Sequence, residues 1–283
     1  MKYYGRVMFI MIENESIDKK DSSIEFLKNT KIWIKKNRYS KNPIIKFLIE
    51  SLYFLINILY TIKRIFTDKE YRALTYIKVF KSSRVQQTTP LTAMDRYPII
   101  FSACKDYFDK KEDIKILSYG CSTGEEVLTL RKYFPTATIV GAEINKHSLE
   151  ICRNLPVDEK ITFINSTPKK IKKYGPFDIV FCMAVLQRTP DRITKEGITS
   201  LKKIYPFEKF EQQIVELDSY VNKGGLLVTH FTQYSFMDTT VSSKYTVLGN
   251  YNQDDYRSSI FDKNSNLIRA RISRNSIFIK MEV

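Results

Sequence analysis

Short apolar runs alternate with amphipathic segments along the last two thirds of the chain. Five runs have the length of buried strands and cover residues 114–119, 138–143, 161–165, 177–183 and 226–230. Three amphipathic segments with helical spacing lie at 125–133, 146–154 and 207–221. This alternation is typical of βαβ units, so it predicts an α/β fold with a doubly wound, mostly parallel sheet. Gly224 and Gly225 are expected to end the last helix, and residues 276–281 to form a final, antiparallel strand.

The N-terminal third has a different pattern. Residues 23–38 place isoleucine and leucine among lysines at helical spacing, and 14 of the 19 residues in 44–62 are apolar or aromatic. The polar residues Lys46, Glu50, Asn57, Thr61 and Arg64 fall on one narrow stripe of a helix. Because Lys46 and Glu50 would both be costly inside lipid, the pattern predicts an amphipathic helix near 44–65 and not a membrane span.

Positive charge is concentrated in the same region. The chain carries a net charge of +15, and residues 1–86 hold 18 Lys and Arg against 8 Asp and Glu. We therefore expect two parts, a basic helical extension at 1–86 and an α/β domain at 87–283. The extension is expected to contact something acidic, and residues 22–66 are candidates for peripheral contact with a membrane. Packing of their apolar face on the domain and a solvated basic surface are the alternatives.

Cysteine, histidine and leader patterns exclude some classes of protein. The four cysteines are far apart without a Cys-x-x-Cys pair, and there are two histidines, so neither a disulfide framework nor a metal centre is expected. The apolar run at 7–12 is too short for a secretory leader and is followed by acidic residues. These features predict a cytoplasmic protein with reduced thiols.

A glycine-bounded turn at 120–124 joins the first predicted strand to a helix. Such a turn lets a ligand approach the backbone and directs free N–H groups of the helix toward it. Its Gly-x-x-x-Gly pattern is neither the dinucleotide Gly-x-Gly-x-x-Gly nor a phosphate-binding loop. Glu143 ends the second strand, where a carboxylate can accept hydrogen bonds from both ribose hydroxyls. The turn and Glu143 together predict an adenosine ligand without phosphates, and S-adenosylmethionine is the obvious candidate.

With these residues in view, the chain resembles the class I S-adenosylmethionine-dependent methyltransferases. The motifs that carry the resemblance are the turn at 120–124, Glu143, the fourth strand with its exit at 177–186, and residues 222–227 before the fifth strand. They occur in the family's order within residues 87–283. The resemblance implies a Rossmann-like fold, methyl transfer, and S-adenosylmethionine as cofactor.

The turn and the fourth strand are most similar to the chemoreceptor glutamate methyltransferase branch. In that branch the first glutamate after the glycine faces the amino group of the cofactor, which implies this role for Glu125. A favourable position at the start of a helix is the alternative reading of Glu125. The other cofactor contacts that the resemblance implies are Gly120, Cys121, Ser122, Gly124, Ile144, Ser166, Thr167, Cys182, Met183 and Val185.

Several positions depart from the family pattern. Ser118 and Ser166 stand where aspartates are common, and Ser122 replaces the middle glycine of the turn. Met183-Ala184 replaces the Arg-Asn pair of the chemoreceptor branch, so the acceptor of that branch is not carried over. A non-catalytic scaffold with a degenerate cofactor fold is therefore one alternative function.

Two further residues are candidates for binding and catalysis. Arg96 lies in a polar segment that leads into the first strand, and we expect it to pair with the carboxylate of the cofactor. An ion pair with a local acidic residue is the alternative for Arg96. In the same segment, Thr88, Thr89 and Tyr97 are expected to line a lid over the cofactor. His230 ends the fifth strand and is the candidate general base, with a strand-capping role as its alternative.

The methyl acceptor is only partly constrained by the sequence. No Asn-Pro-Pro-Tyr-type motif for exocyclic amines follows the fourth strand, and no RNA-binding module with an aromatic RNP pattern is visible. A small molecule or a surface glycan, including a lipid-linked sugar, is therefore the preferred acceptor. An RNA methyltransferase that uses the basic extension is the other alternative, and a nicotinamide oxidoreductase is disfavoured by the missing third glycine.

Overall fold

A computed structural model describes residues 22–36, 43–80, 92–109, 111–270 and 272–282. The chain divides into two units, Met1–Thr75 and Tyr76–Val283. The domain boundary predicted at 86/87 lies outside the described residues, as do the predicted lid residues Thr88 and Thr89.

The second unit is built on a seven-stranded sheet in the order β3-β2-β1-β4-β5-β9-β6. The first five strands of the chain run parallel, whereas β9 is antiparallel to both β5 and β6. A small antiparallel pair, β7 with β8, lies apart from it. The strands are β1 (Lys115–Tyr119), β2 (Thr138–Glu143), β3 (Ile161–Asn165), β4 (Phe177–Met183), β5 (Val221–His230), β6 (Tyr245–Val247), β7 (Ile260–Phe261), β8 (Leu267–Ile268) and β9 (Ile277–Lys280).

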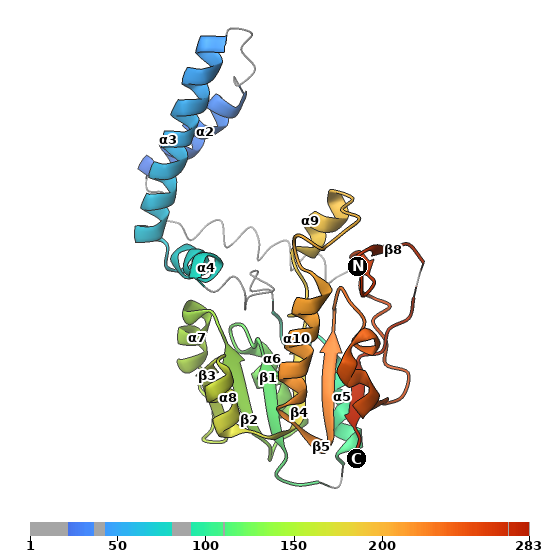
Figure 1. Cartoon of the computed structure of the whole chain (residues 1–283). Helices are drawn as coiled ribbons and strands as arrows, with labels where there is room; N and C mark the ends of the chain where they lie inside the picture. Colours follow the sequence, from blue (N-terminus) through green and yellow to red (C-terminus); the bar gives the residue numbers. More distant parts are fainter. Residues whose placement is uncertain (1–21, 37–42, 81–91, 110, 271, 283) are drawn as a thin grey trace, which may run out of the picture. The chain divides into compact units, whose positions relative to one another are not determined.

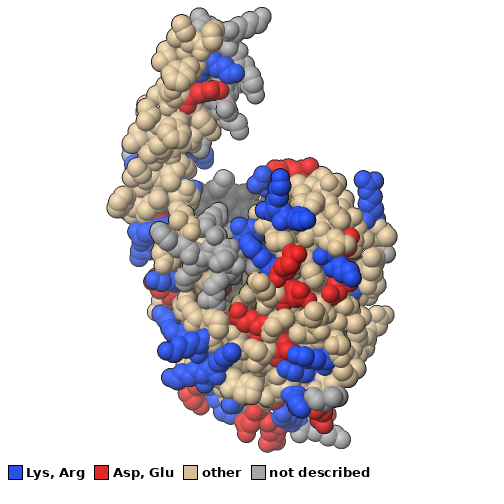
Figure 2. Space-filling view, in the orientation of Figure 1, with Lys and Arg blue, Asp and Glu red and all other residues tan. Residues whose placement is uncertain are grey.

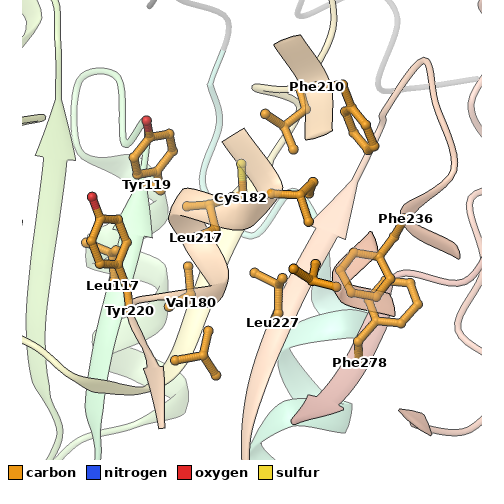
Figure 3. Close-up of a cluster of buried hydrophobic side chains, with 14 of the residues drawn as sticks. Leu117, Tyr119, Val180, Cys182, Phe210, Leu217, Tyr220, Leu227, Phe236 and Phe278 are labelled. Carbon is orange, nitrogen blue, oxygen red and sulfur yellow. The ribbon is translucent and has the colours of Figure 1, made fainter. Parts of the chain in front are cut away.

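Helices cover both faces of this sheet (Figure 1). One face carries α5, α6 and α7, whose buried residues pack with Ile116 and Phe181 in one apolar cluster. The other face carries α8, α9 and α10, which pack with Leu117 and Val180 in a second cluster, shown in Figure 3. The helices of the unit are α5 (Pro98–Tyr107), α6 (Glu125–Tyr133), α7 (Lys146–Arg153), α8 (Pro168–Tyr174), α9 (Pro190–Lys195), α10 (Phe207–Asp218) and the 3₁₀ turns η1 (Phe236–Asp238) and η2 (Thr240–Lys244).

The predicted doubly wound α/β fold is confirmed. The runs at 138–143, 161–165 and 177–183 are strands with the predicted ends, and the final strand is antiparallel as expected. These strands are buried on both faces, so each appears in the sequence as a nearly continuous apolar run. The sequence did not predict α5, α8, α9 or the short strands β6, β7 and β8.

The prediction for residues 207–225 is wrong in one respect. The helix α10 ends at Asp218, and the residues 223–225 lie inside β5 instead of stopping a helix. The pairing of β4 with β5 shifts between Phe177 and Ile179, and Gly224 has φ of 70°. A left-handed glycine is a common device for a bulge, so these glycines bend a strand.

The first unit contains α2 (Ser22–Lys36) packed against α3 (Pro43–Thr67), and α4 (Lys69–Phe80) begins in it. Both predicted helices are therefore present. Ile34 of α2 and Ile56 of α3 are buried, while the polar-stripe residues Glu50 and Asn57 are only half-buried. None of the helices in the described part of the chain is long and apolar enough to cross a membrane.

One side of α3 is apolar and exposed. At 100° per residue its exposed apolar side chains cover an arc of about 160° of the helix surface. We call these residues the apolar arc: Phe47, Leu48, Leu52, Phe54, Leu55, Ile58, Leu59, Ile62 and Phe66, each 38–77% exposed. Figure 2 shows the two helices as a mostly tan surface with few charged atoms.

Candidate active site

The turn after β1 has a backbone that only small residues accommodate. Gly120, Ser122 and Gly124 have φ angles of 80°, 51° and 102°. A Cβ atom on Gly120 would lie 2.5 Å from Cγ2 of Val185, and one on Gly124 would lie 2.5 Å from Cδ1 of Leu155. The Gly120 and Cys121 amides both donate to the Ala142 carbonyl at the end of β2, at 2.8 and 3.3 Å. The turn is therefore fixed against the neighbouring strand.

Glu143 ties the end of β2 to this turn. Its carboxylate accepts hydrogen bonds from the Ser122 amide at 2.9 Å and from the Asn145 amide at 2.6 Å. Burial raises the pKa of Glu143, and its backbone hydrogen bonds oppose that rise. An ionised carboxylate has about four acceptor positions, so both oxygens can still accept from a ligand. Its predicted role as the ribose ligand stays a prediction.

Ser166 lies beside Glu143, because its amide donates to the Glu143 carbonyl at 2.9 Å. The Thr167 hydroxyl accepts from the Lys170 amide and caps α8, and Ile144 follows Glu143 directly. The carboxyl ends of β2 and β3 thus bring four of the predicted cofactor contacts to one edge of the sheet.

A pocket opens where β1 and β4 end. The strand order reverses between these two strands, and open α/β sheets bind their ligands at such a switch point. Its cavity volume is about 30 Å³, far below the roughly 300–1,000 Å³ of typical ligand pockets, so a larger ligand must also use the open edge beside it. The lining residues are Thr92, Ala93, Arg96, Tyr97, Phe101, Gly120, Cys121, Ser122, Glu126 and Met183.

This pocket brings together part of the predicted site. Arg96, Gly120, Cys121, Ser122 and Met183 line it, as does the predicted lid residue Tyr97. Other predicted contacts lie outside its lining, namely Gly124, Glu125, Glu143, Ile144, Ser166, Thr167, Cys182, Val185 and His230. Cys182 lies with Val180 in the apolar cluster of the opposite sheet face, because successive strand residues alternate in direction.

Two buried polar atoms at the pocket have no partner among the described residues, the Tyr97 hydroxyl and Ser122 Oγ. Buried polar groups are normally hydrogen-bonded, so orphans of this kind are expected where a polar ligand binds. The Arg96 guanidinium lies 5.2 Å from the ring centre of Tyr97 and 5.8 Å from that of Phe231. The pocket therefore combines a cation with two hydroxyl groups.

Among the described residues that line the pocket, Glu126 is the one acidic side chain, and it was not singled out from the sequence. Its carboxylate accepts a hydrogen bond from Ser118 Oγ at 2.7 Å. Loss of solvent raises the pKa of Glu126 to about 7, although Ser118 and Arg96 favour the ionised form. Glu125, one position earlier on α6, instead accepts from the Thr123 hydroxyl at 2.7 Å. Ser118 could have pointed to Glu126 in the sequence, because a hydroxyl on a buried strand needs a nearby hydrogen-bond acceptor.

His230 is buried behind the pocket. Its ring nitrogen Nδ1 lies 2.9 Å from Ser276 Oγ, and Nε2 lies 3.6 Å from an oxygen of Asp255. The ring is 3% exposed and contacts the rings of Phe231 and Tyr97 at 4.4 and 5.1 Å between centres. Burial, with Arg96 and Arg274 nearby, lowers the pKa of His230 to about 4. The ring is thus neutral at pH 7, and its role as base stays a prediction.

This histidine should make the fold sensitive to acid. The pKa of His230 is about 4 in the folded state, below its ordinary 6.5. The neutral ring therefore stabilises the folded state fully above pH 6.5, and this stabilisation is lost as pH falls toward 4. The loss should reach about 3 kcal/mol in the free energy of unfolding. Urea unfolding followed by circular dichroism at pH 7.5 and 4.5 should show a smaller acid loss in His230→Asn. A His147→Asn variant should keep the full acid loss; equal losses in all three proteins contradict the prediction.

Part of the chain is similar to known methyltransferases. Residues 110–262 match the profile of a family described as "Methyltransferase domain". The chain is 32% identical over 84 residues to a ubiquinone biosynthesis O-methyltransferase of Vibrio parahaemolyticus, a match that covers 28% of this chain and 35% of that protein. The chain therefore spans about a third of the length of this curated relative.

Two solved methyltransferase structures match part of the chain at low identity. The plantazolicin methyltransferase BpumL in complex with SAH is 16% identical, with a TM-score of 0.35 over 60% of this chain and 56% of that one. SAM-bound CalS10, an amino pentose methyltransferase from Micromonospora echinaspora, is 15% identical, with a TM-score of 0.35 over 55% of each chain.

Proposed function

The chain belongs to the class I S-adenosylmethionine-dependent methyltransferase family, and we propose that the whole protein transfers a methyl group from S-adenosylmethionine to a small-molecule or glycan acceptor. The family match covers just over half of the chain. The observation that carries the proposal is the pocket at the end of β1 and β4, with its cation, its carboxylate and two hydroxyl groups that have no hydrogen-bond partner in the described part of the chain.

The residues at the pocket fit the methionine end of this cofactor, which carries both its carboxylate and its amino group. Arg96 is suited to its carboxylate, Glu126 to its amino group, and the Tyr97 and Ser122 hydroxyls to either. Glu143 at the end of β2 is suited to the ribose hydroxyls. The serine at 118 does not make the fold degenerate, since Glu126 places a carboxylate against that hydroxyl at 2.7 Å.

The cofactor supplies a methyl group already activated by a positively charged sulfur. The chain's residues therefore have to bind, orient and exclude water, and orientation alone can lower a barrier by about 7–11 kcal/mol. The glycine turn is held in place by hydrogen bonds to the Ala142 carbonyl and to Glu143, so it can hold the cofactor in one orientation. His230 is neutral at pH 7, but a pKa of about 4 makes it a weak base, so its role as general base is a proposal only for an acceptor that must lose a proton.

Two similar proteins and one feature of the sequence support the proposed acceptor class. The matched Vibrio protein is named for O-methylation in ubiquinone biosynthesis, and CalS10 is described as acting on an amino pentose. The residues at the exit of β4 contain no motif for an exocyclic amine. A small organic molecule or a sugar is therefore proposed, in preference to protein or nucleic acid.

Transfer of a radiolabelled methyl group tests this proposal. The full chain is incubated with labelled S-adenosylmethionine and with separate lipid-soluble, water-soluble small-molecule, RNA and protein fractions of a bacterial lysate. Label is expected in a small-molecule or glycolipid fraction, and a Glu143→Ala chain serves as the blank. Label that enters RNA or protein alone would overturn the proposed acceptor class.

The affinity for S-adenosylhomocysteine should depend on pH through Glu126. Its pKa of about 7 means that the carboxyl must lose a proton to pair with the amino group of the ligand. Binding should therefore tighten from pH 6 to 8, by up to about tenfold per unit below pH 7. Calorimetry at three pH values measures this. Glu126→Gln should flatten the profile and Glu125→Gln should keep it; the reverse result would assign the role to Glu125.

A further inference from the structure

The apolar arc of α3 is a large exposed surface that the methyl-transfer site does not use. Its nine side chains, at roughly 150 Å² each when fully exposed, present on the order of 700 Å² of apolar area. Patches on soluble monomers are usually a few hundred Å², and larger ones mark interaction sites. Ser51 is the only polar residue within the arc, so it is uninterrupted by charge along the helix.

Two basic side chains of α3 lie away from the arc. Lys46 and Arg64 project from the side of α3 opposite to its centre, at 100° per residue. Residues 22–67 contain nine Lys and Arg against two Asp and Glu. A helix with a wide apolar face and a basic back has the composition of an interfacial helix that lies in the plane of a membrane.

Net charge also distinguishes between the surfaces that could cover the apolar arc, namely the second unit, a second copy of the chain and a membrane. Residues 1–75 hold 15 Lys and Arg against 8 Asp and Glu, and residues 76–283 hold 31 against 23. Both units are thus positively charged, so neither the second unit nor a second copy of the chain complements the first. A second copy would also use a narrow seam, whereas this arc is about 160° wide. An anionic lipid surface complements both the apolar face and the charge.

We propose that α2 and α3 dock the protein on an anionic membrane surface, with α3 parallel to the membrane and the apolar arc inserted at the boundary of headgroups and acyl chains. The inference concerns attachment only and is independent of the proposed methyl transfer.

Vesicle flotation of the full chain tests the attachment. The vesicles are pure phosphatidylcholine or phosphatidylcholine with about a third phosphatidylserine, a mixture that gives the surface a negative potential. The chain should float with the anionic vesicles and bind the neutral ones at least about tenfold more weakly. A Leu55→Glu, Leu59→Glu double variant should lose binding by about 100-fold or more, since burial of each leucine is worth at least about tenfold.

A matched control separates the arc from exposed apolar residues in general. Ile151 and Val215 of the second unit are 39% and 43% exposed, and their double change to glutamate should leave flotation unchanged. The proposal is overturned if the full chain stays with unbound protein on both vesicles. It is also overturned if the arc variant changes only the oligomeric state in light scattering, or only the melting temperature of the second unit. Resistance of the bound chain to alkaline carbonate would indicate insertion across the bilayer and would contradict it too.

Discussion

Replacement of Glu143 by alanine is expected to weaken binding of S-adenosylhomocysteine by at least about 100-fold. Two charge-assisted hydrogen bonds to the ribose are worth about 1.5–3 kcal/mol each. The same change leaves the amides of Ser122 and Asn145 without their acceptor, so the turn loses its anchor to β2. We therefore expect the free energy of unfolding to fall as well, by about 1–3 kcal/mol for each buried amide. Titration calorimetry and thermal unfolding measure the two effects.

Glu143→Gln separates binding from stability. The amide side chain keeps an acceptor for one of the two backbone amides and carries no charge, so about half of the stability loss should be avoided while affinity stays low. Glu150→Ala, on the exposed side of α7, should change neither quantity. If folded Glu143→Ala protein bound the ligand with full affinity, Glu143 would have only a structural role.

Gly120→Ala is expected to produce the second large effect. The new Cβ would lie 2.5 Å from Cγ2 of Val185, at a φ of 80° that disfavours every residue with a side chain. Backbone strain costs about 1–2 kcal/mol and the overpacking about 1–3 kcal/mol, so the melting temperature should fall by several degrees. Because Gly120 also lines the pocket, ligand binding should fall in parallel.

Gly197→Ala measures the cost of backbone strain without the steric clash. Gly197 has φ of 61°, and nothing lies within 4 Å of the position its Cβ would take. This variant should lose only the strain contribution. Addition of Val185→Ala to Gly120→Ala should restore part of the stability, because it removes the clashing methyl group. Equal losses for Gly120→Ala and Gly197→Ala would show that the close approach to Val185 carries no energy.

The fold could be predicted from the sequence because its strands are buried on both faces. A run such as 177–183 contains almost no polar residue, and the glycine turn marks the point where the first strand becomes a helix. The residues 223–225 were misread because glycines end helices and also form bulges, and only the pairing of β4 with β5 distinguishes the two.

The site was harder to predict than the fold. Glu125 and Glu126 are adjacent, and only the path of α6 shows which of them reaches back to Ser118. The position of His230 at a strand end could be read from the sequence. Its burial and its partner Ser276, 46 residues away, depend on how β9 returns to the sheet, which no local pattern indicates.

Titration of the full chain with S-adenosylhomocysteine is the most direct measurement of the central claim, that the pocket at the end of β1 and β4 binds this cofactor. We expect one binding site per chain, a rise in melting temperature with ligand concentration, and loss of both in Glu143→Ala. Absence of heat and of any thermal shift in the folded wild-type chain would contradict it.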